Sequence, residues 1–142
     1  MSYIFNIGLN RAGTSSLNDA LNYLGISSLH HRFKGERLTT IVKRNQEKGQ
    51  RLFYGLENFT AFTDFSGWNY YKTLDEQYPN SRFIMTYRDL HSWLYSRERH
   101  VKAHGGIVNR ARWEKQYKEK IPEIFSYFRN RKDFLIINIP NG

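Results

Sequence analysis

Two glycines near the start of the chain mark the first stretch that could bind an anion. Gly8 and Gly13 are separated by four residues, and Thr14 and Ser15 follow directly. This is the spacing of the phosphate-binding loop G-x-x-x-x-G-K-[ST], except that threonine stands where lysine is usual. Backbone N–H groups of such a loop, and the positive end of the helix after it, attract a phosphate whichever residue stands there. Arg11 supplies a positive charge inside the loop.

The missing lysine bears on what the loop binds. Nucleoside-triphosphate enzymes use that lysine to neutralise phosphate oxygens and the Ser/Thr hydroxyl to hold Mg²⁺. Thr14 in its place therefore weighs against a triphosphate ligand. A transferred sulfuryl group carries less negative charge, so one cation and hydroxyl donors suffice without a metal. Because short glycine motifs have many false positives, a strand-to-helix turn without a ligand is the alternative for the loop taken alone.

A second pair of candidate ligand residues lies in "RFIMTYRDLHSWLYS", residues 82–96. Arg88 follows an apolar strand pattern, and Ser96 comes eight residues later in a predicted helix with Asp89 as its N-cap. Ligands of α/β proteins bind at the carboxyl ends of parallel strands, so this pair suits a second phosphate. The alternatives are that Arg88 pairs with the capping Asp89 and that Ser96 is a surface residue.

Alternating patterns predict the elements that would position these residues. Strands are predicted at 3–9, 26–32, 59–65, 82–87 and 134–139, and helices at 14–24, 35–49, 68–78, 89–104 and 107–130, the last interrupted at Pro122. The fold class is therefore α/β, a three-layer α/β/α arrangement with a mainly parallel sheet of about five strands, P-loop-like. Because the last strand is an uninterrupted apolar run, it is expected in a central position.

Composition predicts one domain over residues 1–142 and an anionic partner. The formal net charge is +9, which suits nucleic acid, a polyanionic substrate or a multiply phosphorylated small molecule. With no cysteine, neither a disulfide nor a thiolate metal site is possible. No signal peptide or membrane-spanning run is evident, so a soluble, cytoplasmic protein without membrane contact is expected.

Both candidate anion sites resemble motifs of the sulfotransferases that use 3′-phosphoadenosine 5′-phosphosulfate. "FNIGLNRAGTSSLNDALNYLG", residues 5–25, is similar to their 5′-phosphosulfate loop, in the branch with G-x-x-R-[ST]-G-T-x-S-L. "YPNSRFIMTYRD", residues 78–89, with Ser96 beyond it, resembles their 3′-phosphate motif. Two motifs in the expected order and on the expected elements are stronger evidence than either one.

The resemblance implies the donor and the residues that bind it. The donor would be 3′-phosphoadenosine 5′-phosphosulfate, the product adenosine 3′,5′-bisphosphate, and the acceptor a hydroxyl or an amine, with no metal expected. The implied donor contacts are Asn10, Arg11, Ala12, Gly13, Thr14, Ser15, Arg88 and Ser96.

The resemblance also implies the catalytic residues. Arg11 would stabilise the leaving phosphate, and Asp64 would be the base for the acceptor proton, because family members carry an acid in a similar D-[FW]-P context. Ser66 stands where that proline is usual. The alternatives for Asp64 are the N-cap of the following helix or the metal-holding acid of a triphosphate enzyme.

The resemblance extends over residues 3–98 and the last strand. Family members usually continue beyond that strand with a segment and a closing helix that this sequence lacks, so a minimal or binding-only sulfotransferase is an open alternative. A P-loop nucleotide or small-molecule kinase predicts binding of Mg·ATP. A basic nucleic-acid-binding domain predicts salt-dependent oligonucleotide binding, but no recognised motif favours it. The sequence does not identify the acceptor or the oligomeric state.

Overall fold

The computed structural model describes residues 2–9 and 12–139. The elements in chain order are β1 (Ile4–Asn6), α1 (Thr14–Tyr23), β2 (Ser28–His30), β3 (Arg32–Phe33), β4 (Glu36–Arg37), α2 (Leu38–Glu47), β5 (Ala61–Thr63), the 3₁₀ helix η1 (Gly67–Asn69), α3 (Tyr71–Gln77), β6 (Arg82–Tyr87), α4 (Leu90–Ala103), α5 (Arg110–Tyr127) and β7 (Phe134–Asn138).

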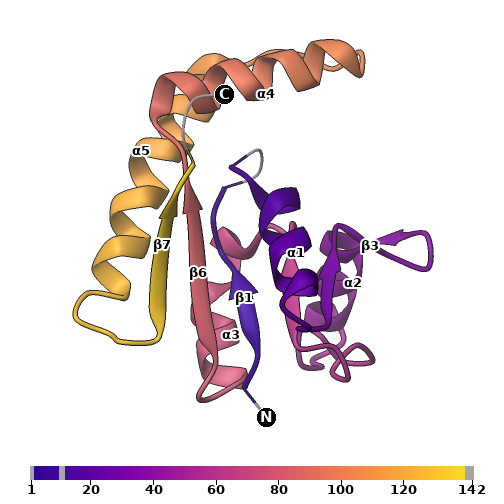
Figure 1. Ribbon diagram of the computed structural model, residues 1–142. Helices are drawn as coiled ribbons and strands as arrows, with labels where there is room; N and C mark the ends of the chain where they lie inside the picture. Colours follow the sequence, from indigo (N-terminus) through magenta and orange to yellow (C-terminus); the bar gives the residue numbers. More distant parts are fainter. Residues whose placement is uncertain (1, 10–11, 140–142) are drawn as a thin grey trace.

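Five of the strands form one parallel sheet in the order β2-β5-β1-β6-β7 (Figure 1). The α/β fold class predicted from the sequence is confirmed. Because β1 is the middle strand, the loop that follows it leaves from the centre of the carboxyl edge. β3 and β4 form a separate antiparallel hairpin before α2, so the helix predicted from residue 35 begins only at Leu38.

Strand alternation gives the sheet two different apolar faces. Ile4 packs on the face covered by α1, in a small cluster with Leu17 and Leu21. Phe5 and Phe83 point to the other face, where the larger core gathers side chains from α2, α3, α4 and α5. Helices therefore cover both faces, as the three-layer prediction required.

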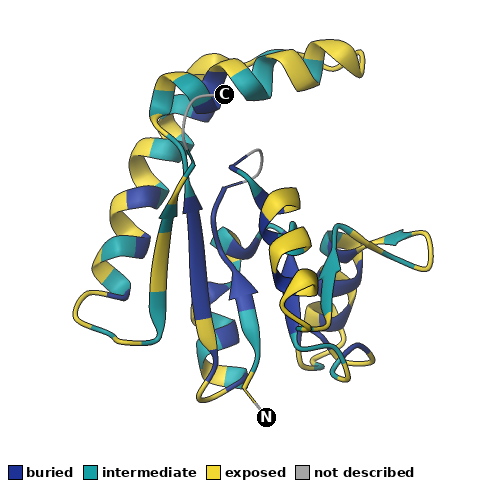
Figure 2. Cartoon of the chain, viewed as in Figure 1, coloured by how far each residue is buried: buried dark blue, intermediate teal, exposed yellow. Residues whose placement is uncertain are grey.

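The last strand was predicted to be central, and this is wrong: β7 lies at the end of the sheet beside β6. Leu135 and Ile136 are 56% and 47% exposed, so both faces of β7 are partly open to solvent (Figure 2). An apolar run shows that a strand has two apolar faces, but it contains no information about how many neighbours the strand pairs with.

The interruption predicted at Pro122 is also wrong, because α5 is a single helix through that residue. Pro122 is exposed, whereas Ile121 and Ile124 are buried on the side that packs on the core. The backbone carbonyl that loses its helical partner to the proline therefore lies on the solvent side, where water can satisfy it.

No helix in the described part of the chain is long and apolar enough for a membrane crossing.

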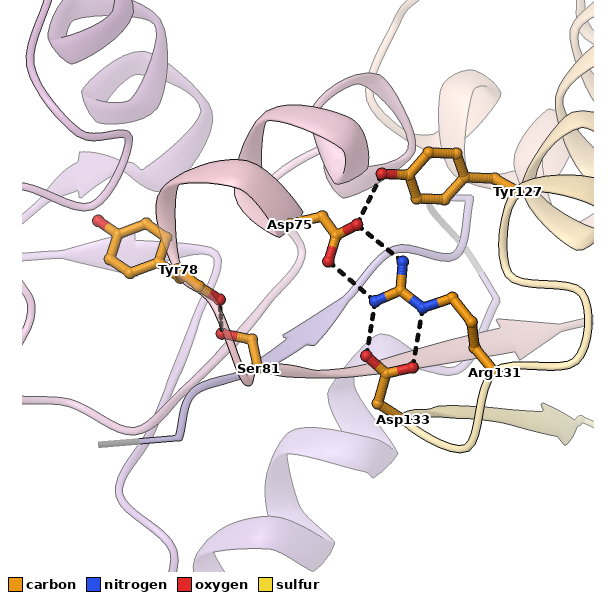
Figure 3. Close-up of polar contacts among 6 residues, drawn as sticks. All are labelled: Asp75, Tyr78, Ser81, Tyr127, Arg131 and Asp133. Atoms are coloured by element: carbon orange, nitrogen blue, oxygen red, sulfur yellow. Dashed lines mark hydrogen bonds and ion pairs between the residues drawn. The ribbon is translucent and has the colours of Figure 1, made fainter.

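An ion-pair network joins three elements at the amino end of β7 (Figure 3). Arg131 donates to both carboxylate oxygens of Asp75 on α3, at 2.7 and 2.9 Å, and to both oxygens of Asp133, at 3.0 and 2.6 Å. The Tyr127 hydroxyl at the end of α5 donates to Asp75 at 2.6 Å. Hydrogen bonds from Arg131 hold the pKa of Asp75 and of Asp133 below the ordinary value.

Replacing the shared arginine tests this network. We expect Arg131→Met to lower the free energy of unfolding by about 2 kcal/mol at pH 7, because two partly buried carboxylates lose their charged partner. Arg129→Met is the matched control, since Arg129 is exposed on the same turn, and we expect it to cost less than about 0.5 kcal/mol. Equal losses in the two variants, measured by urea unfolding, would contradict this prediction.

The network also predicts a pH dependence. A carboxyl whose pKa is lower in the folded protein contributes stability that is fully present above its unfolded pKa, about 4 for aspartate, and is lost as the pH falls through the folded pKa. The wild-type stability contributed by Asp75 and Asp133 should therefore decline below about pH 4. We expect a smaller decline in Arg131→Met over the same pH range.

Candidate active site

The strand that leads into the loop is attached to β6 by a buried side chain. Asn6, 2% exposed, donates from Nδ2 to Thr86 Oγ1 at 3.2 Å and accepts the Gly8 N–H on Oδ1 at 2.9 Å. A Cβ at Gly8 would lie 2.4 Å from the carbonyl oxygen of Thr86. Since a backbone oxygen cannot move aside without separating the two strands, only glycine allows this close approach.

The loop ends at a helix whose first N–H groups have no partner within the helix. Gly13, the N-cap of α1, has a φ of 79° and makes no side-chain capping bond, and the first turn contains no acid. The first backbone hydrogen bond of the helix is donated by the Leu17 N–H to the Gly13 carbonyl oxygen, at 3.1 Å. The N–H groups of residues 14–16, together with the helix dipole, are therefore available to an anion.

Arg88 lies directly after β6, at the same edge of the sheet. The Tyr117 hydroxyl of α5 donates to its carbonyl oxygen at 2.8 Å, which holds the backbone. Its Nε is buried without a hydrogen-bond partner, and Arg88 forms no ion pair with any residue that the structure describes. Asp89 instead accepts the Ser92 N–H at 3.0 Å as the N-cap of α4, as predicted. The alternative pairing of Arg88 with Asp89 is therefore wrong.

These elements line a cleft of about 890 Å³. Figure 1 shows that α4 extends over the carboxyl edge of the sheet. Its lining residues are the N-cap and first turn of α1, Arg88 after β6, and residues of α4 with its C-cap: Gly13, Thr14, Ser15, Ser16, Arg88, Ser92, Tyr95, Ser96, Arg99, His100, Lys102, Ala103 and His104. The structure therefore brings five predicted donor contacts together from two distant segments of the chain. Among the described residues, neither aspartate nor glutamate lines this cleft.

Three predicted donor contacts are not placed in the cleft. Ala12 is buried, 2% exposed, and does not line the cleft. Asn10 and Arg11 lie outside the described residues. Their roles stay predictions from the sequence.

Asp64, the predicted base, directly follows β5, the strand that pairs with β1. It does not line the cleft. Its φ is 56°, and its Oδ2 lies 3.0 Å from Nδ1 of His31. The residue before η1 is Ser66, so Asp64 is not the N-cap of the following helix.

Beside the pair of Asp64 and His31, Nδ1 of His30 lies 2.8 Å from the Thr63 hydroxyl, and burial lowers the pKa of His30. Among the described residues, no group of three or more acidic or histidine side chains is arranged to hold a metal.

Comparison with known proteins decides the family. The sulfotransferase domain family matches residues 3–135 of the sequence. The chain belongs to that family. The fold is also similar to a gluconokinase from Sinorhizobium meliloti 1021, with a TM-score of 0.60 and 12% identity over 99% of this chain and 84% of that one. At this identity the likeness concerns the fold alone. No curated protein matches the sequence significantly.

Sequence reasoning missed several residues of this sulfotransferase-domain cleft. Ser92, Arg99 and Ala103 share with Ser96 the face of α4 that lines it. Helical periodicity counted outward from Ser96 would have found them, because positions three, four and seven apart lie on one face. Asn6 carries no such signal, since its role depends on contact with a strand far away in the sequence.

Two glycine variants test the packing of the loop. Gly13 and Gly25 both have positive φ, but a Cβ at Gly13 would lie 2.7 Å from Ile139 Cδ1, whereas a Cβ at Gly25 meets nothing. We expect Gly25→Ala to cost about 1 kcal/mol of folding stability for backbone strain, and Gly13→Ala about 2–3 kcal/mol because the contact is added. Urea unfolding gives both values, and equal costs would show that Ile139 moves aside freely.

Proposed function

We propose that this protein transfers a sulfuryl group from 3′-phosphoadenosine 5′-phosphosulfate to an acceptor hydroxyl or amine. One observation carries the proposal. The uncapped start of α1 and the pair Arg88 and Ser96, which match two separate sulfotransferase motifs, line the same cleft. Membership of the sulfotransferase domain family supports the same reaction.

The described residues fit a donor that carries anionic groups at both ends. The guanidinium of Arg88 has a buried Nε without a partner, so a 3′-phosphate would satisfy it, and Ser96 would add a hydroxyl donor from α4. The N–H groups at the start of α1, with Thr14 and Ser15, would bind the 5′-phosphosulfate. No acid among the lining residues that the structure describes opposes the negative charges of the donor.

The reaction then needs charge neutralisation and a base. The acceptor oxygen or nitrogen forms a bond to sulfur as the bond between sulfur and the bridging phosphate oxygen breaks, which releases adenosine 3′,5′-bisphosphate. We assign Arg11, by resemblance, to the charge that develops on the leaving phosphate. A guanidinium does not release its proton in a protein, so its contribution is electrostatic.

We assign the acceptor proton to the pair formed by Asp64 and His31. Asp64 directly follows β5, the strand that pairs with β1, so it lies at the same sheet edge as the end of β1. The contact of 3.0 Å with His31 Nδ1 orients one side chain against the other. In this arrangement the carboxylate can take the proton directly or stabilise His31 as it does so.

Calorimetric titration tests the donor site. We expect adenosine 3′,5′-bisphosphate to bind without a metal at least about tenfold more tightly than 5′-AMP, because the second phosphate gains charged contacts. Arg88→Ala should remove most of this advantage. Arg82→Ala is the matched control, since Arg82 begins the same strand at the opposite edge and is exposed, and it should leave the affinity unchanged.

Other outcomes of this titration would contradict the proposal. Preference for Mg·ATP over the bisphosphate would indicate a kinase. If neither nucleotide binds, the cleft is not a nucleotide-binding site, and the proposed donor site is wrong. An equal loss in Arg82→Ala and Arg88→Ala would show that only the overall charge attracts the nucleotide.

A turnover measurement tests the base without an identified acceptor. With water as acceptor, slow release of sulfate from radiolabelled 3′-phosphoadenosine 5′-phosphosulfate reports the chemical step. We expect Asp64→Asn to slow this release by about 10²-fold or more, as for loss of a general base, with the affinity for the bisphosphate unchanged. An unchanged rate in Asp64→Asn would exclude this residue as the base.

A further inference from the structure

Arg99 lies on the same face of α4 as the serine assigned to the 3′-phosphate. It follows Ser96 by three positions, and both residues line the cleft. Positions three apart on a helix are neighbours, with Cβ atoms about 5–6 Å apart. The long side chain of Arg99 can therefore reach a group that accepts a hydrogen bond from the Ser96 hydroxyl.

The guanidinium of Arg99 is directed back along α4, toward the start of the helix. Cα–Cβ bonds in an α-helix tilt toward its N-terminus, so a side chain covers the turn before its own. The Arg99 guanidinium accordingly lies 5.6 Å from the ring of Tyr95, one turn earlier. Arg88 directly precedes Asp89, the N-cap of α4. The charge of Arg99 therefore lies on the side of its turn that is nearer to Arg88.

No acid in the described part of the chain competes for this guanidinium. Arg99 is exposed and forms no ion pair with any described residue. Lys102, which also lines the cleft from α4, differs because it pairs with Glu98 at 3.0 Å. Arg99 is therefore the cation of α4 that is free to bind an anion in the cleft.

A 3′-phosphate needs more positive charge than Arg88 supplies. A phosphate monoester carries a charge of about −1.5 to −2 at pH 7, since its second pKa is about 6. One guanidinium carries a single positive charge, and the Ser96 hydroxyl is a neutral donor. The contacts assigned above therefore leave part of the phosphate charge without a cation.

We infer that Arg99 is a second cation for the 3′-phosphate and makes the cleft selective for nucleotides that are phosphorylated at the 3′ position. This inference rests on the proposed function. A guanidinium can donate two parallel hydrogen bonds to phosphate oxygens, so Arg99 adds both charge and geometric selectivity. A donor without the 3′-phosphate, such as adenosine 5′-phosphosulfate, would lose these contacts and bind more weakly.

Calorimetric titration with two isomers of equal charge tests the inference. Adenosine 3′,5′-bisphosphate and adenosine 2′,5′-bisphosphate differ only in the position of one phosphate. We expect the wild type to bind the 3′,5′ isomer about tenfold or more tightly and Arg99→Ala to lose most of this preference, because charge-assisted hydrogen bonds depend on position. In the same variant the affinity for 5′-AMP, which lacks that phosphate, should fall by less than about threefold, since only general attraction is lost.

Lys102→Ala is the matched control for charge. It removes one positive charge from the same lining, three positions later on α4. Both side chains are exposed, so neither substitution disturbs the core. We expect Lys102→Ala to keep the preference for the 3′,5′ isomer. Equal affinity of the wild type for the two isomers, or equal loss of the preference in Arg99→Ala and Lys102→Ala, would overturn the inference.

The wild type and Arg88→Ala distinguish failure of the inference from failure of the proposed function. If the wild type binds neither bisphosphate, or prefers Mg·ATP, the proposed function fails. If the wild type prefers the 3′,5′ isomer and Arg88→Ala loses this preference while Arg99→Ala keeps it, the donor site stands. The inference that Arg99 contributes to it is then wrong.

Discussion

The site depends on the close contact between β1 and β6. Asn6 connects the end of β1 to Thr86 and to its own loop, and Gly8 lies so near the Thr86 carbonyl that no side chain fits between them. This contact fixes where the loop leaves the sheet and, two residues beyond Thr86, where Arg88 emerges. The two candidate anion-binding motifs therefore leave the sheet from two strands that a buried polar contact joins.

Electrostatics gives the cleft its second property. The chain carries many acids, yet none of them lines the cleft, while Arg88, Arg99 and Lys102 do. Several acids elsewhere in the protein are paired with cations, as in the Arg131 network at the opposite edge of the sheet (Figure 3). The Arg131 network and the cleft are thus separated by the length of the strands, and Arg88 forms no ion pair with any described residue, so an anion that binds Arg88 need not break a structural ion pair.

The sequence was most informative where a pattern is local. The start of a helix at Thr14, the strand of residues 82–87 and the cap at Asp89 were each predicted and are each found. The sequence pattern was misleading where the structure of a segment depends on its contacts with other segments of the chain. The apolar run of β7 indicated a central strand, but the number of neighbours of a strand depends on how other segments pair. Asp64 could be predicted as an acid at a strand end, but its contact with His31 could not.

The sequence by itself determined the fold class, the family and the two motifs, because hydrophobic periodicity and residue spacing are properties of short segments. Only the tertiary structure decided that Arg88 and Ser96 share a cleft with the start of α1, that this cleft has no acidic lining, and that α4 extends it outward with Arg99 and Lys102. These facts depend on strand order and on the direction in which α4 leaves β6. Both are set by packing between segments far apart in the sequence, which no local pattern encodes.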